Sequence, residues 1–296
     1  MEAPVRRADL ATALMAAAIA ACARASNAPP PPPVVVPPPA ASGSASHDSS
    51  DVVSLYERAC DGGSAVGCNN LGLVLLEGRH GKGRDPARAA SLFQRACDMN
   101  LATGCGNLGF IEHQGSGVPR NDAKAVGLLT RACDAGLLEM CYWLGDVFFG
   151  GEQEDLPHAY EVFDAACQKG HTRSCASEGI MIQLGKGVAK DGGRAAVLLE
   201  KACGADVAFA CSSLGTLFLD GDGVRVDAER ARADYEKGCT DEYPRGCYAY
   251  AVACASGKLG DDYVARAEPL LRRACKGGHA DSCALLAQWL EKKEQQ

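Results

Sequence analysis

The sequence predicts an all-α solenoid built from repeated helical hairpins, and three observations lead to this prediction. Fourteen of the 16 cysteines fall into C-x7-C pairs, whose first members are separated by 37, 36, 34, 36, 36 and 36 residues. A stripe of small and large apolar residues precedes each pair, and a glycine follows six of the seven pairs at a fixed distance. A period near 36 residues is typical of helical repeats.

The segment before each pair has the apolar pattern of an α-helix, which we call helix B. The residue before the first cysteine is alanine in every copy except Gly238, and the eighth residue before it is alanine in every copy except Val52. The fourth residue before it is large, as at Phe93. Offsets of one, four and eight share one face of a helix, and small residues there allow close packing. Asp85 followed by Pro86 is typical of a helix start.

The segment after each pair predicts a second helix, which we call helix A. Four copies have Leu-Gly three and four residues after the second cysteine, and six copies have glycine ten residues after it. Glycine adopts the left-handed conformation that ends a helix at little cost, so helix A is expected to stop there. Copies four, six and seven depart from the Leu-Gly pattern at Glu178, Tyr250-Ala251 and Leu286-Ala287.

The loops and helix ends together resemble a known family. Gly-x-Gly-Val begins at Gly115, Gly185 and Gly221, and an Asp and a closing Ala-Cys follow. This combination resembles the Sel-one-like repeat, a relative of the tetratricopeptide repeat. The C-x7-C pair in every copy is similar to its secreted subgroup, the Helicobacter cysteine-rich proteins. The resemblance covers residues 51–293 and implies an α/α solenoid with a right-handed superhelix.

We expect each C-x7-C pair to form a local disulfide, because the short connection places the end of helix B beside the start of helix A. Closing so small a loop contributes roughly 2.5 kcal/mol per bridge. Zinc sites and redox centres normally use closer cysteine spacings, which do not occur here, so we expect no metal and no cofactor. The expected bridges are Cys60–Cys68, Cys97–Cys105, Cys133–Cys141, Cys167–Cys175, Cys203–Cys211, Cys239–Cys247 and Cys275–Cys283.

Cys254 stands outside this pattern, at a position that is apolar in five of the other six copies. We expect a buried free thiol there, and the alternative is a reactive or intermolecular cysteine. So many cysteines indicate an oxidising compartment, since long-lived disulfides are rare in the cytosol. A redox-active thiol protein is the third class of function to consider.

The N-terminal 50 residues predict a targeting signal followed by a linker. Residues 10–21 are apolar and too short to span a membrane, so residues 1–21 are expected to be a signal peptide. Ile19-Ala20-Ala21-Cys22 resembles the bacterial lipoprotein cleavage box, which implies a lipid on Cys22; the alternative is an ordinary signal peptide cleaved at an Ala-x-Ala site. Residues 22–50 are a Pro/Ala/Ser-rich linker, extended at about 3.1 Å per residue in its Pro-rich part.

The predicted domains are therefore this signal peptide and linker, a solenoid over residues 51–293 and a tail over residues 294–296. Ala23, following the lipid-bearing cysteine, favours the outer membrane of a cell envelope by the same resemblance. The net charge of −7 argues against nucleic acid, because binding phosphates requires a basic face. The lipid is the expected contact with the membrane, and the protein is expected to be monomeric.

The resemblance also implies an alternative activity, penicillin binding or weak β-lactamase hydrolysis. Serine enzymes of that class need a nucleophile with a lysine one helical turn on, as in S-x-x-K, and this motif is absent. The six histidines are scattered, with no H-x-H or H-E-x-x-H for a zinc route. We therefore expect no catalytic residues and a non-enzymatic protein.

The favoured function is binding of a protein, a peptide or a peptidoglycan-derived ligand on the concave face of the solenoid. By analogy with tetratricopeptide arrays, helix A lines this face, and positions one, five and eight after the second cysteine point into it. The candidate binding residues are Asn69, Tyr142, Asp146, Phe149, Gln183, Ser212, Thr216 and Tyr248.

Overall fold

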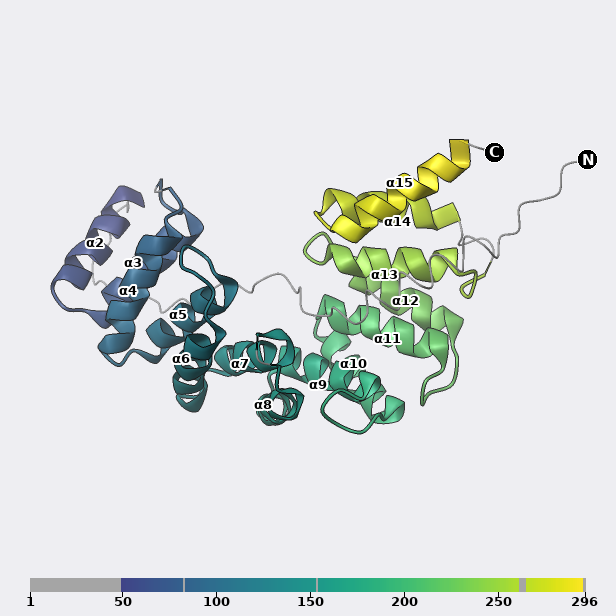
Figure 1. Cartoon of the computed structure of the whole chain (residues 1–296), viewed down its shortest axis with the longest axis horizontal. Coiled ribbons are helices and arrows are strands. Elements are labelled where there is room, and N and C mark those ends of the chain that lie inside the picture. Colours follow the sequence, from purple (N-terminus) through teal and green to yellow (C-terminus); the bar gives the residue numbers. More distant parts are fainter. Residues whose placement is uncertain (1–48, 82, 153, 261–264, 295–296) are drawn as a thin grey trace, which may run out of the picture. The chain divides into compact units, whose positions relative to one another are not determined.

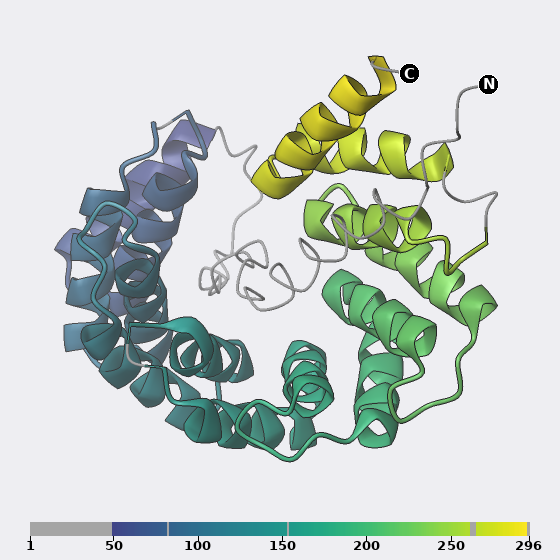
Figure 2. The ribbon, with the colours of Figure 1, turned by 45° about the vertical axis from the view of Figure 1, so that its right-hand side comes forward.

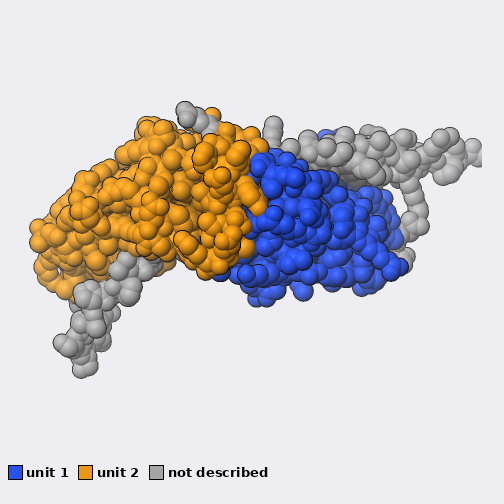
Figure 3. Space-filling model, turned by 90° about the horizontal axis from the view of Figure 1, so that it is seen from below, with its two compact units in different colours: residues 1–30, 170–296 blue, residues 31–169 orange. Residues whose placement is uncertain are grey.

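The computed structural model describes residues 49–81, 83–152, 154–260 and 265–294, which form two compact units (Figure 3). The described part of unit 2 ends at Lys169, and that of unit 1 begins at Gly170. The predicted signal peptide, Cys22, nearly all of the linker and the last two residues lie outside the described residues.

The described part of unit 2 consists of helices that each pack against the next in sequence (Figure 1). The helix A members α3, α5 and α7 also contact one another in order. Helix B corresponds to α2 (Ser49–Asp61), α4 (Pro86–Asp98), α6 (Asp122–Asp134) and α8 (Leu156–Gln168). Helix A corresponds to α3 (Ala65–Glu77), α5 (Ala102–Gln114) and α7 (Leu138–Gly150).

Unit 1 follows the same plan, and Figure 2 shows its helices stacked in sequence order. Here α9, α11 and α13 are the helix A members that contact one another in order. Helix A corresponds to α9 (Thr172–Leu184), α11 (Ala208–Asp220), α13 (Pro244–Ala255) and α15 (Ala280–Glu294). Helix B corresponds to α10 (Gly192–Gly204), α12 (Ala228–Gly238) and α14 (Ala267–Lys276).

The helix ends have the chemistry that the sequence indicates. The Asp85 side chain accepts a hydrogen bond from the Arg88 N–H at 3.0 Å and caps α4, and Asn121 caps α6 in the same way through the Lys124 N–H at 2.9 Å. These side chains satisfy backbone donors that have no partner inside the helix. At the other end, α3 stops at Gly78, which has the left-handed φ of 70°.

Small residues bring the hairpins together around a few large ones. Phe93 of α4 and Phe163 of α8 are almost completely buried. A Cβ at Gly72 or Gly145 would lie 2.7 or 2.5 Å from the Cε1 atom of the facing phenylalanine, so only glycine allows this close approach. Most alanines of the helix B stripe are likewise buried, so the array forms a core with few aromatic residues.

Disulfides join helix B to the following helix A at the repeat spacing. Six bridges connect cysteines eight positions apart with Cα separations of 4.2 to 4.7 Å, and Cys167 and Cys175 are disulfide-bonded as well. In copy six, α12 ends at Gly238, so Cys239 is the C-cap residue and lies just outside the helix. The chain then turns before α13 begins at Pro244. The predicted α/α solenoid with one disulfide per repeat is confirmed.

Every regular element in the described part of the chain is a helix, and 14 are present. Within these residues no helix is both long enough and apolar enough to cross a membrane.

Candidate functional site

The candidate binding residues on helix A occupy two kinds of environment. Four of them are buried and contribute mainly to packing: Asn69, Tyr142, Ser212 and Tyr248. The other four are half-buried: Asp146, Phe149, Gln183 and Thr216. Tyr142 lies in an aromatic cluster, with ring centroids 5.2 Å from Trp143 and 5.9 Å from Phe163. Helix A therefore presents fewer of these side chains to solvent than their spacing indicates.

Thr216 and Asp146, two of the half-buried candidates, contact side chains of other helices. The Thr216 hydroxyl lies 2.9 Å from the Tyr235 hydroxyl of α12, and Asp146 Oδ2 lies 3.5 Å from His113 Nε2 of α5. Phe149 at the end of α7 and Gln183 at the end of α9 are the remaining two. Both belong to the last turn of a helix A, beside the loop that leads to helix B.

A row of buried amides joins the first two helix A members of unit 2. Asn107 of α5 donates from Nδ2 to Asn69 Oδ1 of α3 at 2.9 Å, and Asn69 Nδ2 donates to Asn70 Oδ1 at 3.3 Å. All three side chains are buried. The sequence analysis includes Asn69 but misses Asn70 and Asn107, which occupy the next position in their repeats. Hydrogen bonds between buried amides favour one register between neighbouring hairpins, although Asn107 Oδ1 has no hydrogen-bond partner among the described residues.

A buried ionic network, which we call the His113 hub, joins α5, α6 and α7. His113 Nδ1 donates to Asp122 Oδ1 at 2.7 Å, and both side chains are less than one-tenth exposed. Arg120 donates to both Asp122 carboxylate oxygens, and the Glu152 backbone N–H donates to Oδ2 at 2.7 Å. One carboxylate thus connects two loops and the ends of two helices in neighbouring repeats.

The charged groups of the hub shift one another's pKa values. Burial alone would raise the pKa of Asp122, but hydrogen bonds from Arg120, the Glu152 N–H and His113 outweigh it and lower the pKa to about 2. Burial likewise opposes the charged form of His113, yet hydrogen bonds to Asp146 and Asp122 raise its pKa above 6.5. The hub is therefore a charged, internally satisfied structure at moderately acidic pH. The sequence analysis gave no indication of this network.

Two other histidines cap helices, in agreement with their shared repeat position. His171 Nδ1 accepts a hydrogen bond from the Ser174 N–H, and His279 Nδ1 accepts one from the Ser282 N–H, each at 3.3 Å. This role is that of an N-cap side chain at the start of helix A. Among the described residues, no group of three His, Cys, Asp or Glu side chains is placed to hold a metal ion.

Three arginines two residues before the first cysteine, Arg95, Arg131 and Arg273, contact a cysteine of the preceding junction. Arg95 Nη2 donates to the Cys60 carbonyl at 3.1 Å, and Arg131 Nη1 lies 3.3 Å from Cys97 Sγ, its Nη2 donating to the Cys97 carbonyl. A cation at the end of a helix pairs with carbonyls that have no partner in the helix. This position is basic in six of the seven copies, which is the sequence signal that would have revealed the contact.

Cys254 is free and completely buried in α13. Burial raises the pKa of its thiol to about 12, so almost none of it is thiolate at neutral pH. In a Cys22→Ser variant we expect a thiol-specific maleimide to label one cysteine per chain after unfolding without reductant, and almost none in the native state. Rapid native labelling, or three or more labelled cysteines after unfolding, would contradict this assignment.

Together these features define an all-α repeat scaffold whose hairpins are linked by disulfides. The Sel1 repeat model matches residues 65–101, 102–137, 138–171, 177–206 and 208–240, which is more than half of the chain. The chain belongs to the Sel1 repeat family. A search of curated proteins finds no match.

Two solved structures show the same fold. A Sel1 repeat protein from Oxalobacter formigenes aligns with a TM-score of 0.64 and 19% identity, over 76% of this chain and 96% of that one. The protein c5321, described as a protective antigen of uropathogenic Escherichia coli with an SLR fold, aligns with a TM-score of 0.61 and 23% identity over 81% of this chain. This chain spans about half, 52%, of that protein. Helicobacter pylori cysteine-rich protein B is 23% identical over 43% of this chain and 92% of its own, with a TM-score of 0.34.

Proposed function

We propose that this protein is a lipid-anchored scaffold of the bacterial cell envelope that binds a protein, a peptide or a peptidoglycan fragment through helix A. The observation that carries the proposal is the disulfide at successive hairpin junctions of a Sel1 array. Such bridges belong to an oxidising, extracytoplasmic compartment. They also restrict each hairpin, so a partner meets a surface that loses little conformational entropy on binding.

The half-buried end of helix A supports the choice of surface. Gln183 combines partial exposure with an amide that both donates and accepts hydrogen bonds, which suits the backbone of an extended ligand. Phe149 occupies the same repeat position and offers an apolar contact. Polypeptide or glycan-peptide strands present both kinds of group.

Site-specific photo-crosslinking in intact cells tests the surface. A photoreactive amino acid at Gln183 is expected to capture a discrete partner, whereas the same amino acid at Val197, which is 66% exposed on helix B, is expected to capture little. Equal capture at both positions would place binding elsewhere. Capture at Val197 alone would overturn the assignment to helix A.

The anchor is tested separately. Metabolic labelling with an alkyne fatty acid is expected to mark the chain, and Cys22→Ser is expected to abolish the label and release the protein from the membrane fraction. The Cys254→Ser variant serves as the matched control, because its thiol is buried and is not expected to carry lipid. Labelling that survives in Cys22→Ser would contradict the proposed anchor.

A further inference from the structure

Copy six carries a carboxylate at a helix B position that is apolar in every other copy. The fifth residue before the first cysteine is leucine in five copies and Val162 in copy four, but it is Asp234 in copy six. Leu92 and Leu128, which have this position in copies two and three, are buried. Asp234 therefore occupies a place that the repeat normally fills with an apolar side chain.

The Asp234 side chain is buried without a hydrogen-bond partner for one of its oxygens. The residue is 8% exposed, and its Oδ2 atom has no such partner among the described residues. By contrast, the buried carboxylates of Asp122 and Glu178 each accept a hydrogen bond from an arginine. A buried polar atom without a hydrogen bond destabilises the folded state, and an ionised carboxylate does so more strongly.

The helix that carries Asp234 has little buried apolar surface to offset this cost. Ala231 and Tyr235 are the only apolar side chains that α12 buries. In copy two, α4 buries Leu92, Phe93, three alanines and Cys97. A segment with few buried apolar contacts opens locally at a lower free energy than the rest of a structure. Within unit 1, α12 is therefore poorly secured at the point where its carboxylate is buried.

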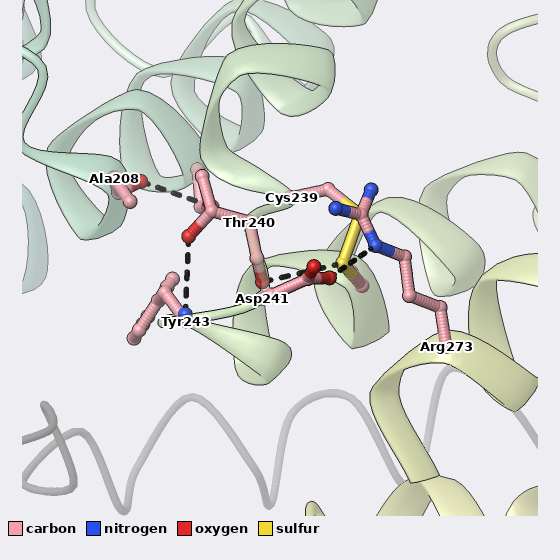
Figure 4. The surroundings of a disulfide bond; sticks show 8 residues. Ala208, Cys239, Thr240, Asp241, Tyr243 and Arg273 are labelled. Carbon is pink, nitrogen blue, oxygen red and sulfur yellow. Dashed lines mark hydrogen bonds and ion pairs between the residues drawn. A yellow bond between two sulfur atoms is a disulfide. The ribbon is translucent and has the colours of Figure 1, made fainter. Parts of the chain in front are cut away.

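The end of α12 is held in place, so the opening is confined to the helix itself. The disulfide of Cys239 follows directly, and Arg273 Nε donates to Asp241 Oδ1 at 2.9 Å beside it (Figure 4). Earlier in the helix, the Tyr235 hydroxyl lies 2.9 Å from the Thr216 hydroxyl of α11. Opening of α12 thus releases Thr216 on helix A, while the junction stays covalently closed.

The charged groups around Asp234 act in opposite directions. Burial raises the pKa of Asp234 and outweighs the cations Lys237 and Arg230 of the same helix, which favour the charged carboxylate. Glu200 of α10 and Asp227 at the start of α12 raise the pKa further, because like charges oppose ionisation. Glu200 also binds Arg230 at 2.5 Å, so part of that positive charge is already compensated.

The two helices packed against α12 contain few other ionisable groups. The only charged side chain of α11 is Asp220, which pairs with Lys258 at 2.7 Å. In α13 the ionisable side chains outside the disulfides are Arg245, Tyr248, Tyr250 and Cys254.

We propose that α12 is a pH-sensitive segment of unit 1, which the protonated side chain of Asp234 keeps packed on α11 and which ionisation of Asp234 releases into a locally open state. The sign follows from linkage. An acid whose pKa is raised on folding binds its proton more tightly in the folded state, so packing is complete below the ordinary value of 3.8 and weakens as the pH rises through the folded value.

Hydrogen exchange of the oxidised full-length chain tests this proposal. Protection factors are measured over a pH series that starts near 3.8, each corrected for the intrinsic exchange rate at that pH. We expect the protection of α12 to fall by about tenfold or more along the series, as for one buried polar group left without a hydrogen bond, while that of α10 changes less. In Asp234→Asn the protection of α12 is expected to stay constant with pH.

Glu229→Gln is the matched control, because Glu229 lies on the same helix with an exposed side chain. It is expected to keep the wild-type profile. Asp234→Leu restores the residue of the other copies and is expected to protect α12 at every pH. A pH profile in Asp234→Asn equal to that of the wild type, or an equal fall in α10 and α12, would overturn the proposal. Thr216 is a candidate residue of the proposed function, but the opening is measured without any ligand, so its result is independent of that function.

Discussion

Replacing Asp122 with alanine is expected to lower the free energy of unfolding by about 3–5 kcal/mol, as when one member of a buried ion pair is removed. The carboxylate accepts hydrogen bonds from His113, Arg120 and the Glu152 N–H, so its loss removes three hydrogen bonds, including the one from the buried His113 ring. Chemical denaturation of the oxidised protein, followed by circular dichroism, measures the change.

Asp134→Ala is the control, because Asp134 is exposed at the end of the same helix. A surface substitution of this kind usually changes stability by less than about 0.5 kcal/mol. If both variants lose the same free energy of unfolding, the His113 hub has no special role in holding the repeats together.

The hub also gives the protein a pH-dependent stability with a defined sign. The folded-state pKa of His113 is raised above 6.5, so its contribution is complete below pH 6.5 and is lost as the pH rises through the folded value. The pKa of Asp122 is lowered from 3.8 to about 2, so its contribution is complete above pH 3.8 and is lost as the pH falls towards 2. The stability difference between the wild type and His113→Gln is therefore expected to be largest between these limits. A difference that increases above pH 7 would contradict the assignment.

Removing one junction disulfide is expected to have the second large effect. The double substitution Cys97→Ala and Cys105→Ala should lower the free energy of unfolding by roughly 2–3 kcal/mol, because the open loop gains conformational entropy in the unfolded chain. The expected consequence is local, since each hairpin of a repeat protein contacts only its neighbours. Denaturation without reductant, together with hydrogen exchange across α4 and α5, measures both the magnitude and the location.

Cys254→Ala is the matched control for this loss. Cys254 is as buried as Cys97 and Cys105, but it forms no bridge, so its substitution measures the cost of removing a buried sulfur alone. The double variant should lose more than twice as much free energy of unfolding as Cys254→Ala loses. If the double variant loses no more than twice the loss of Cys254→Ala, the disulfide contributes nothing to stability beyond the packing of its two sulfur atoms.

The local features of the fold could be predicted because their signals lie close together in the sequence. The Asp85 cap, the Gly78 stop and the alanine stripe of helix B each depend on residues within one or two helical turns. The His113 hub could not be predicted in this way. Its partners, Asp122 and Asp146, are nine and 33 residues away, and no other copy has this combination of residues.

The binding candidates show the same limit. Positions one, five and eight of helix A follow from helical periodicity, but their exposure depends on how closely the next hairpin packs. Asn69 and Tyr142 are buried by neighbouring helices, whereas Gln183 stays half-exposed.

The sequence by itself determined the repeat, the alternation of helix A and helix B, and the spacing of the cysteines, because a hairpin is specified by short-range caps, glycine stops and the periodicity of small residues. The tertiary structure alone decided which charges are buried together. These outcomes depend on contacts between residues nine to 33 positions apart, whose distance and geometry are set by the packing of successive hairpins.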